Sequence, residues 1–545
     1  MESRFYDPKT PGKAPAVPCV DATRILIAGK IRDCRDEPGV SVITVRSPIR
    51  ELSVVAASGE AAEGVAIGRM AMCTETIALE AVNAAAAAYN HGAGEWPRMT
   101  PAGRIECLEK YAKLLRERRL EIAAVLQWEI CKNASAALKE VDRTIAYIHD
   151  TLDDLKLLEN TSSHMVKTGG ILAQVKRSAL GVALIASPYN YPLNETYTTL
   201  IPALAMGNTC VLKTPRTGGL CHAQTLEMFA ECFPAGVVNI VHGSGRTVFT
   251  PIMKSGLVNI FAFIGTHKAA QALHVQHPRP FGVRLALGLD AKNPAFVLPS
   301  ADLDQAAEEV TLGALSYGGQ RCTAIKITFV HSSVADAFVE KLAANVEKLS
   351  MGLPWDGAAI TPLPEPGKTD YLRDLIQDCE ANGAKVVNEH GGRVDAPAYM
   401  FPAVLYPCTL SMRVAKEEQF GPVVPVFRYD DISELQDFLR NETLYGQQAA
   451  IFTQDHEDIP QILDYLAHHV TRINLNAQCQ RGPDVMPFSG RKASATGTLS
   501  VRDALRTMSI RVAVATKSND RNSIKLFENV LREGKSNLLR AELLI

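Results

Sequence analysis

Hydrophobic residues follow two different periods along the chain. In the N-terminal part they recur every three or four positions, which predicts helices over residues 74–90, 102–131 and 135–158. Further along, short uninterrupted apolar runs appear, beginning with GVALIAS at 181–187 and TCVLKTP at 209–215. Runs of this length, bounded by Gly or Pro, are typical of strands that are buried on both faces.

These apolar runs alternate with helical segments in two successive series. The first series continues through 236–243 and 258–265, and the second begins at 293–298 and continues through 324–331 and 422–429. Strands that alternate with helices in this way form parallel sheets covered by helices, so the predicted fold class is α/β. A chain of 545 residues is too long for one hydrophobic core and is expected to divide into two or three domains.

The two series also set the predicted domain boundaries. We expect a loosely attached N-terminal extension, rich in Pro and charge, over residues 1–40. A first α/β domain is expected over 41–290 and a second over 291–490. A further strand segment over 491–515 precedes a polar, mildly basic helical tail over 516–545.

Composition narrows the class of protein. The formal net charge of −2 gives no long-range reason to expect nucleic acid or an anionic membrane as a partner. The 12 cysteines are scattered without a C-x-x-C pair, which predicts neither a disulfide framework nor a metal site. We therefore expect reduced thiols and a cytoplasmic location. The N-terminal stretch has no apolar core of the kind found in a secretory signal, and no run is long and apolar enough to span a bilayer.

One cysteine stands in an unusual setting, the stretch SYGGQRCTAIK at 316–326. A cysteine taken alone is more often a small buried apolar residue than a nucleophile. Here Gly318 and Gly319 permit backbone torsions that are closed to other residues, and Arg321 is expected to favour a thiolate. The stretch falls between a predicted helix and a predicted strand, where α/β proteins place chemistry. Cys322 is therefore a candidate nucleophile.

Two further stretches follow predicted strands of the first series. Asn190 in ASPYNYPLNE either donates a hydrogen bond to a developing oxyanion or serves as a turn residue between prolines. Lys213 and Arg216 in VLKTPRTGG either contact the ribose or phosphate of a nucleotide or form a solvated basic turn. The Gly-rich HGSGRTV at 242–248 is not a full G-x-G-x-x-G and is weak evidence for a dinucleotide.

Six motifs occur in one order between residues 48 and 514, namely SPYNYPLN, VLKTP, FIGT, GGQRCTA, EEQFGPV and MPFSGRKAS. On these motifs the sequence resembles the aldehyde dehydrogenase superfamily. The resemblance implies a Rossmann-like cofactor domain at 41–290, an α/β catalytic domain at 291–490 and a small β oligomerisation flap. The flap would draw on about 154–180 and on the strand at 491–515. The resemblance also implies a homotetramer or homodimer, and oxidation of an aldehyde through a cysteine thioester.

The resemblance assigns roles to individual residues. Cys322 matches the nucleophile and Asn190 the oxyanion donor. The positions that match cofactor contacts are Lys213 for the adenosine ribose or its phosphate, Gly265 and Thr266 for the turn beside the diphosphate, and Glu418 and Phe420 for the nicotinamide ribose and ring. NAD-preferring relatives often carry a glutamate at the position of Arg216, so the arginine implies NADP as the cofactor.

Several segments, among them VDRTIAYI, ITPLPEPGKTDYLRDLI and CQRGPDVMPF, look most like the non-phosphorylating, NADP-dependent glyceraldehyde-3-phosphate dehydrogenases. In that subfamily the substrate phosphate is bound at the positions of Arg143, Tyr191, Arg321 and Arg481, and we group the neighbouring Thr323 with them. Guanidinium groups suit phosphate because they form a rigid bidentate fork. A carboxylate also fits such a cluster, so a succinic semialdehyde or coenzyme A-acylating semialdehyde dehydrogenase is an alternative. Two further alternatives are that these arginines form independent surface ion pairs, and that the chain is a non-catalytic NADP-binding or structural protein.

One stretch departs from the family pattern. Members usually read Glu-Leu-Gly-Gly-Lys before the strand that starts the catalytic domain, and this glutamate activates the water that releases the acyl group. Here the stretch is RLALGLDAKNPAFVL, and aligning it on ALG places Ala286 at the glutamate with two extra residues before Lys292. Asp290 in the altered turn is then the candidate base, unless it only caps the turn. Otherwise coenzyme A accepts the acyl group, or the scaffold has lost activity.

Overall fold

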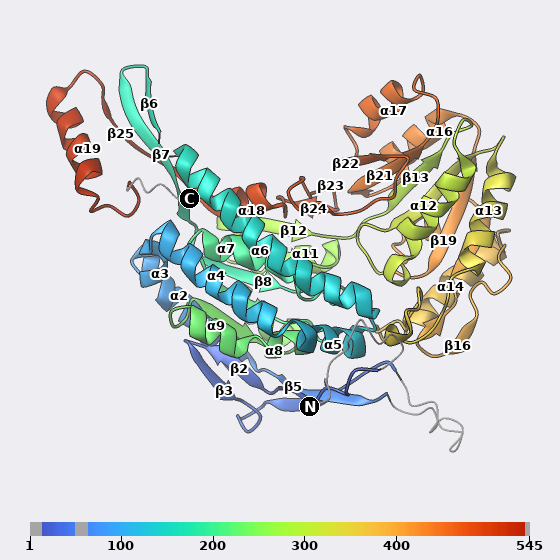
Figure 1. The fold of residues 1–545 in the computed structure, drawn as a ribbon, viewed down its shortest axis with the longest axis horizontal. Helices are drawn as coiled ribbons and strands as arrows, with labels where there is room; N and C mark the ends of the chain where they lie inside the picture. The colour runs from blue at the N-terminus through green and yellow to red at the C-terminus, as the bar shows by residue number, and fades with distance from the viewer. Residues whose placement is uncertain (1–13, 50–63, 163, 540–545) are drawn as a thin grey trace.

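The computed structural model describes residues 14–49, 64–162 and 164–539. It consists of two α/β bodies, each with its own sheet, and a three-stranded arm that projects from the first body (Figure 1). Residues 1–13 of the predicted extension and 540–545 of the predicted tail lie outside the described residues. Among the residues described, no helix is long and apolar enough to cross a membrane. The predicted α/β class is confirmed.

The first body is built on an eight-stranded sheet with the order β24-β12-β11-β8-β9-β10-β2-β3, in which β24 (Ala495–Thr496) is the edge strand beside β12. Its central strands are parallel: β8 (Val182–Ala186), β9 (Thr209–Lys213), β10 (Val238–Val241), β11 (Val258–Ile264) and β12 (Arg284–Gly288). The chain moves outward from β8 to β10 and then returns to the other side of β8 for β11. In open α/β sheets, ligands bind outside the carboxyl ends of the strands where the order reverses in this way.

Both faces of this sheet are buried, and the side chains of β8 alternate between them. Ala183 and Ile185 pack in one apolar cluster, whereas Val182 and Leu184 pack in another. The first cluster includes side chains of α4 (Pro101–Glu117), α5 (Arg119–Ile130), α6 (Ala134–Ser162) and α7 (Asn194–Ala205), and the second includes those of α2 (Glu75–Tyr89) and α10 (Thr250–Lys254). The structure divides the helix predicted over 102–131 into α4 and α5. The break lies at Arg118, whose torsions of φ −97° and ψ 12° are not helical.

The second body contains a seven-stranded sheet with the order β15-β18-β19-β14-β13-β21-β22. Apart from the short edge strand β15 (Lys385–Val386), the strands are parallel: β13 (Asn293–Val297), β14 (Ile325–His331), β18 (Ala403–Cys408), β19 (Val423–Tyr429), β21 (Gln448–Phe452) and β22 (Arg472–Leu475). Helices α12 (Leu303–Leu315), α13 (Ala335–Glu347) and α14 (Lys368–Ala381) pack against it. The loop with Cys322 enters the central strand β14, so the middle of the sheet positions the thiol.

The arm is an antiparallel sheet of β6 (Met165–Thr168), β7 (Ile171–Ala179) and β25 (Ser509–Lys517). It joins the two segments that were predicted to form a flap, although the first of these begins within α6. The predicted tail continues into α19 (Arg521–Glu533), which lies beside β25 at the outer end of the arm (Figure 1). The role of this arm in oligomerisation stays a prediction.

The N-terminal region differs from the expected loose extension. Its strand β2 (Arg24–Ile27) pairs with β10 of the first sheet, and β3 (Lys30–Asp33) pairs with β2 at the sheet edge. Ile25 and Leu26 are fully buried. A four-residue strand among charged residues carries too little periodicity to be recognised, whereas the sheet edge that it covers is decided by the tertiary fold.

Candidate active site

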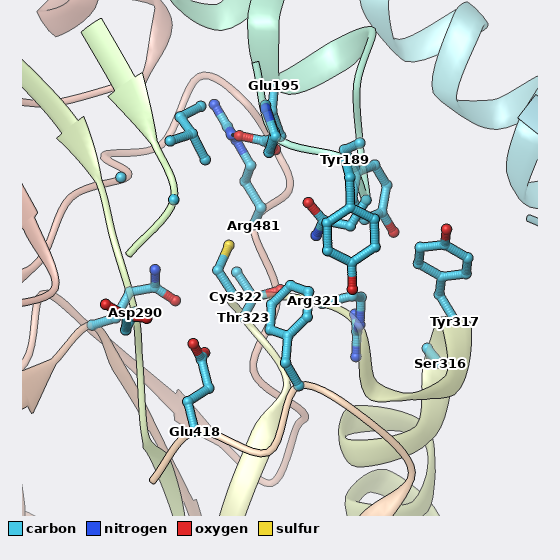
Figure 2. Close-up of a pocket in the computed structure, with 18 of the residues that line it drawn as sticks. Tyr189, Glu195, Asp290, Ser316, Tyr317, Arg321, Cys322, Thr323, Glu418 and Arg481 are labelled. Carbon is cyan, nitrogen blue, oxygen red and sulfur yellow. Dashed lines mark hydrogen bonds and ion pairs between the residues drawn. The ribbon is translucent and has the colours of Figure 1, made fainter. Parts of the chain in front are cut away.

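A cavity of about 1610 Å³ lies between the loops that follow β8, β11 and β12 and the loop that precedes β14. Every predicted site residue except Lys213 and Arg216 lines it. Figure 2 shows Cys322 near its centre, with Arg481 and Glu195 on one side and Glu418 and Asp290 on the other. Residues from both bodies therefore surround one thiol.

The backbone before Cys322 adopts torsions that few sequences permit. Tyr317, Gly318 and Gly319 have φ values of 54°, 58° and 75°. A Cβ atom on Gly319 would lie 2.5 Å from the carbonyl oxygen of Gly421, so only glycine fits there. The loop is thus shaped by close backbone approach, and this explains the glycine pair in the sequence.

Side chains from neighbouring strands hold the carbonyl group of Cys322. Nδ2 of Asn293 and Nζ of Lys326 each donate a hydrogen bond to it, both at 2.8 Å. Lys326 also lies 2.9 Å from the carboxylate of Glu418. The thiol therefore sits on a backbone that is fixed from two directions.

The electrostatic setting of the thiol differs from the prediction. Burial raises the pKa of Cys322 and Glu195 raises it further, whereas Lys326 and Arg481 lower it. Arg321, the expected partner of a thiolate, instead donates from Nη2 to the carbonyl of Gly313 at 2.8 Å. The thiol is therefore protonated at rest, and Lys326 and Arg481 are the cations that favour its ionisation.

Asn190 follows β8, and hydrogen bonds hold both its side-chain amide and its backbone carbonyl. Its Nδ2 donates to the carbonyl of Gln320 at 2.8 Å, and its own carbonyl accepts from Nζ of Lys132 at 2.9 Å. Lys132 forms a fully buried ion pair with Glu140, whose Oε1 also accepts the backbone N–H of Leu193 at 3.1 Å. An amide nitrogen has two N–H groups, so one of them is available for an oxyanion beside Cys322.

The predicted anion-binding arginines share the cavity, but two of them already have carboxylate partners. Arg143 holds Asp484 through two hydrogen bonds of 2.7 and 2.5 Å. Arg481 forms a buried ion pair with Glu195, and its Nε lies 3.3 Å from Asp484. Among the described residues Arg321 has no carboxylate partner, and its Nε is buried without a hydrogen bond.

Two other members of the predicted anion group lie beside this cluster. Tyr191 packs edge-on against Tyr317 with the ring centroids 6.0 Å apart, and Nζ of Lys132 stands 3.3 Å from its ring centroid. Burial raises the pKa of Tyr191 to about 12, so its hydroxyl stays protonated as a donor. Thr323 is buried next to Cys322 and lines the cavity. Both side chains offer neutral polar groups to an anion bound by the arginines.

The predicted cofactor residues lie where the strand order reverses. Gly265 and Thr266 follow β11, and a Cβ atom on Gly265 would meet the Phe263 ring at 2.7 Å. Phe420 presents its ring to the cavity from a backbone with φ 45°, which is strained for this residue. Glu418 accepts the Ala291 N–H at 3.2 Å, and burial raises the pKa of its carboxyl. A crevice with this shape and these groups fits a dinucleotide.

Lys213 and Arg216 lie apart from the residues that line the cavity. Lys213 ends β9, is buried, and holds its Nζ 5.3 Å from the centroid of the Phe249 ring. Burial lowers the pKa of Lys213 to about 8, with a further contribution from Arg216. Arg216 is exposed in the following turn. Both therefore lie outside the crevice, and their contact with a cofactor stays a prediction.

Ala286 does not occupy the position expected from the alignment. It is fully buried in β12, paired with Ala262 of β11, and does not line the cavity, whereas Gly288 does. Placing Gly288 at the family's glutamate aligns Gly288 to Lys292 with Glu-Leu-Gly-Gly-Lys and leaves no extra residues. Similarity of the letters ALG had shifted the alignment by two positions, and the place of Gly288 at the cavity end of the strand corrects it.

Asp290 lines the cavity, but its carboxylate is already engaged. Its Oδ2 accepts hydrogen bonds from the backbone N–H of His267 at 2.6 Å and from Nδ1 of His267 at 2.8 Å. His267 is the first residue of α11 (His267–His274), so Asp290 satisfies an N–H that this helix end leaves unpaired. This is the turn-capping interpretation of Asp290.

Several residues around the thiol escaped the sequence analysis. Lys326 interrupts the apolar strand run AIKITFVH, which is an unusual position for a charge and was a usable signal. Glu195 lies on α7, all of whose residues are buried, but its sequence alone reads as an ordinary helix start. Lys132, Glu140 and Asp484 gave no signal, because their contacts with Asn190, Leu193 and Arg143 span 58, 53 and 341 positions.

Comparison with known proteins agrees with this geometry. Residues 54–514 match the model of the aldehyde dehydrogenase family. The NADP-dependent glyceraldehyde-3-phosphate dehydrogenase of Streptococcus equinus is 36% identical over 76% of this chain and 86% of its own. An alpha-ketoglutaric semialdehyde dehydrogenase of Bacillus subtilis is 29% identical over 76% and 86%. The structure of the NADP complex of the Bacillus halodurans glyceraldehyde-3-phosphate dehydrogenase superposes with a TM-score of 0.82, at 31% identity, covering 91% of this chain and 99% of that one. The chain therefore belongs to the aldehyde dehydrogenase family and is an NAD(P)-dependent enzyme that acts on aldehydes.

Proposed function

We propose that this enzyme oxidises a small anionic aldehyde with NADP, through a thioester on Cys322, and that glyceraldehyde 3-phosphate is the leading candidate. The observation that carries the proposal is the set of guanidinium groups in the same cavity as the thiol. Among them, Arg321 has a buried Nε without a partner. A buried unpaired donor is costly, and an anionic substrate would satisfy it.

The residues around the thiol support this chemistry. Cys322 adds to the aldehyde carbon, and the resulting oxyanion meets the remaining N–H of Asn190. Lys326 and Arg481 assist by favouring the thiolate. When bound, NADP supplies the hydride acceptor, which leaves the acyl group on Cys322 as a thioester. The residues that would hold NADP are those of the crevice together with Lys213 and Arg216, whose positive charges suit the 2′-phosphate.

The charges of the cavity also favour a second candidate. Asp484 and Glu195 neutralise two of the three guanidinium groups, so this arginine cluster keeps one net positive charge. One positive charge matches a carboxylate more closely than a phosphate dianion. An aldehyde that carries a carboxylate, such as succinic semialdehyde, is therefore the alternative substrate, and the alpha-ketoglutaric semialdehyde dehydrogenase among the relatives bears a name of this class.

The test is a substrate panel with purified protein and NADP. It compares glyceraldehyde 3-phosphate, succinic semialdehyde and the uncharged propanal, each with and without coenzyme A. Arg321→Met should raise KM for the preferred anionic aldehyde about 10- to 100-fold and leave propanal almost unchanged, because one charge-assisted contact is lost. Arg373→Met, at an exposed position of α14, is the matched control.

Two results would contradict the proposal. An equal loss for charged and uncharged aldehydes would mean that Arg321 only supports the loop. Absence of NADPH formation with every aldehyde would favour a non-catalytic NADP-binding or structural protein.

The arm is proposed to join a second copy of the chain, in a homotetramer or homodimer. Its strands expose several large apolar side chains, namely Met165, Val166, Ile171 and Ile510. Apolar surface gathered on a projecting sheet supports an interface. The mass of the particle in solution, measured for the parent and for Val166→Glu, tests this proposal, since an unchanged mass would contradict it.

A further inference from the structure

The strand end that carries a glutamate in most family members carries Gly288 here. We propose that Glu195 is the general base that activates the water which releases the acyl group from Cys322. The inference rests on the proposed function, because it requires a thioester on Cys322. It moves the base from the end of β12 to the first turn of α7.

Glu195 has the position that this role requires. It lines the same cavity as Cys322, and its side chain is 9% exposed, so it is shielded from bulk water. Of the charged groups that act on the Cys322 thiol, Glu195 has the largest effect, ahead of Lys326 and Arg481. Glu195 and the thiol therefore face the same cavity.

The contacts of Glu195 leave one of its oxygens available. Arg481 donates from Nη1 to Oε2. No hydrogen bond within the described part of the chain involves Oε1. A carboxylate held at one oxygen, with the other turned to a cavity, is able to accept a proton from water.

The other carboxylates of the cavity near the thiol are more fully occupied. Each accepts at least two hydrogen bonds or ion pairs from the protein, whereas a single donor contacts Glu195. The donors are Lys326 and the Ala291 N–H for Glu418, two nitrogens of His267 for Asp290, two nitrogens of Arg143 for Asp484, and Lys132 with the N–H groups of Leu193 and Asn194 for Glu140. Among these described carboxylates, Glu195 is therefore the one that the fewest protein donors contact.

The proposed step needs only water. Oε1 of Glu195 accepts one proton while the water oxygen bonds to the thioester carbon. The carbon–sulfur bond then breaks, the electron pair leaves with the sulfur of Cys322, and the acyl group departs as a carboxylic acid. The proton on Glu195 passes to solvent, which restores the carboxylate. No oxidant or reductant is involved in this half of the reaction.

The test separates formation of the thioester from its release. Parent and Glu195→Gln are mixed with NADP and the preferred aldehyde of the panel, and NADPH is followed from the first turnover. Glu195→Gln should give a burst of about one NADPH per active site and a steady state slower by about 10²–10⁴-fold, because general-base assistance is lost. Intact mass should show the acyl adduct accumulating on the variant and not on the parent.

A second variant guards against a purely structural effect. Gly288→Glu, made in the Glu195→Gln background, returns a carboxylate to the family's position and should restore at least part of the steady-state rate. A Cβ atom there would lie 3.5 Å from Ile264 Cγ1 and 3.2 Å from Leu499 Cδ1, so the Leu499 side chain has to move by a few tenths of an ångström. Gly288→Gln in the same background is the control and should restore nothing.

The possible outcomes are distinct. Steady-state turnover of Glu195→Gln equal to that of the parent would overturn the inference, and a burst would still support the proposed function. Loss of the burst itself in Glu195→Gln would overturn it too, because Glu195 would then only position Arg481. A parent that stalls after one burst until coenzyme A is added would show that water is not the acceptor. If even the parent forms neither burst nor adduct, the proposed function fails instead.

Discussion

Each of the two bodies forms one wall of the cavity, and the two walls differ in the functional groups that they hold in place. The wall from the second body holds Cys322 on a loop fixed by three positive φ values and by hydrogen bonds from Asn293 and Lys326. The wall from the first body ends β12 with Gly288, which brings no functional group to the cavity. The contrast teaches that one wall fixes the thiol, whereas the end of β12 in the other wall supplies no base, so the proposed release of the acyl group needs a carboxylate from another element.

The largest expected effect tests the fixed wall directly. Cys322→Ala should lower aldehyde oxidation by on the order of 10⁴-fold or more, because no other group can form the thioester. NADP binding should stay near that of the parent, which titration calorimetry can measure. Substantial turnover by this variant would remove Cys322 from the mechanism.

The next prediction concerns the loop at which the two walls meet. Asn190→Ala removes the amide that bonds to Gln320 and that is predicted to stabilise the developing oxyanion. The rate of the NADPH burst should fall by about 10²–10³-fold, the usual cost of losing one oxyanion donor. Rapid mixing gives this rate, and a burst as fast as that of the parent would assign the oxyanion to backbone groups alone.

The outer edge of the first-body wall is expected to set cofactor preference. Arg216→Glu replaces an exposed cation by an anion beside Lys213. The preference for NADP over NAD should fall about 10- to 100-fold, since one charge-assisted phosphate contact is lost and repulsion is added. The ratio of kcat/KM for the two cofactors measures it, and equal ratios in variant and parent would mean that Arg216 does not contact the phosphate.

A matched pair of glycines tests how rigid the thiol wall is. Gly319→Ala should destabilise the protein by about 1–3 kcal/mol, because φ is 75° and the new Cβ would lie 2.5 Å from the Gly421 oxygen. Gly318→Ala should cost less, since its φ is 58° but its Cβ would meet nothing closer than 3.7 Å. Denaturant unfolding compares the two, and equal losses would mean that close approach does not matter.

The smallest expected effect is a pH dependence on the cofactor side. Because burial lowers the pKa of Lys213 to about 8, its positive charge is present at pH 7 and mostly lost at pH 9. Affinity for NADP should therefore fall with rising pH, by at most about tenfold over this interval. Lys213→Arg should flatten the profile, and a parent with constant Kd from pH 7 to pH 9 would contradict the prediction.

Local patterns were sufficient for much of this protein. The apolar runs at 181–187 and 209–215 became β8 and β9, because strands buried on both faces have an uninterrupted apolar sequence. The glycine pair before Cys322 was informative for a similar reason, since positive φ and close backbone approach leave almost no other residue possible. Backbone torsions and the spacing of buried positions are local properties, so they can be predicted directly from the sequence.

What the sequence by itself determined, then, is the α/β class, the order of the strands along the chain, the cysteine loop and, through its motifs, the family. Tertiary structure decided which carboxylate pairs with which cation. Arg143 with Asp484 and Arg481 with Glu195 are pairs separated by 341 and 286 positions. It also decided that Gly288, and not Ala286, meets the cavity, because that depends on the register of β12 against β11. Electrostatic partners and strand register are set by contacts between distant segments, and no local pattern encodes them.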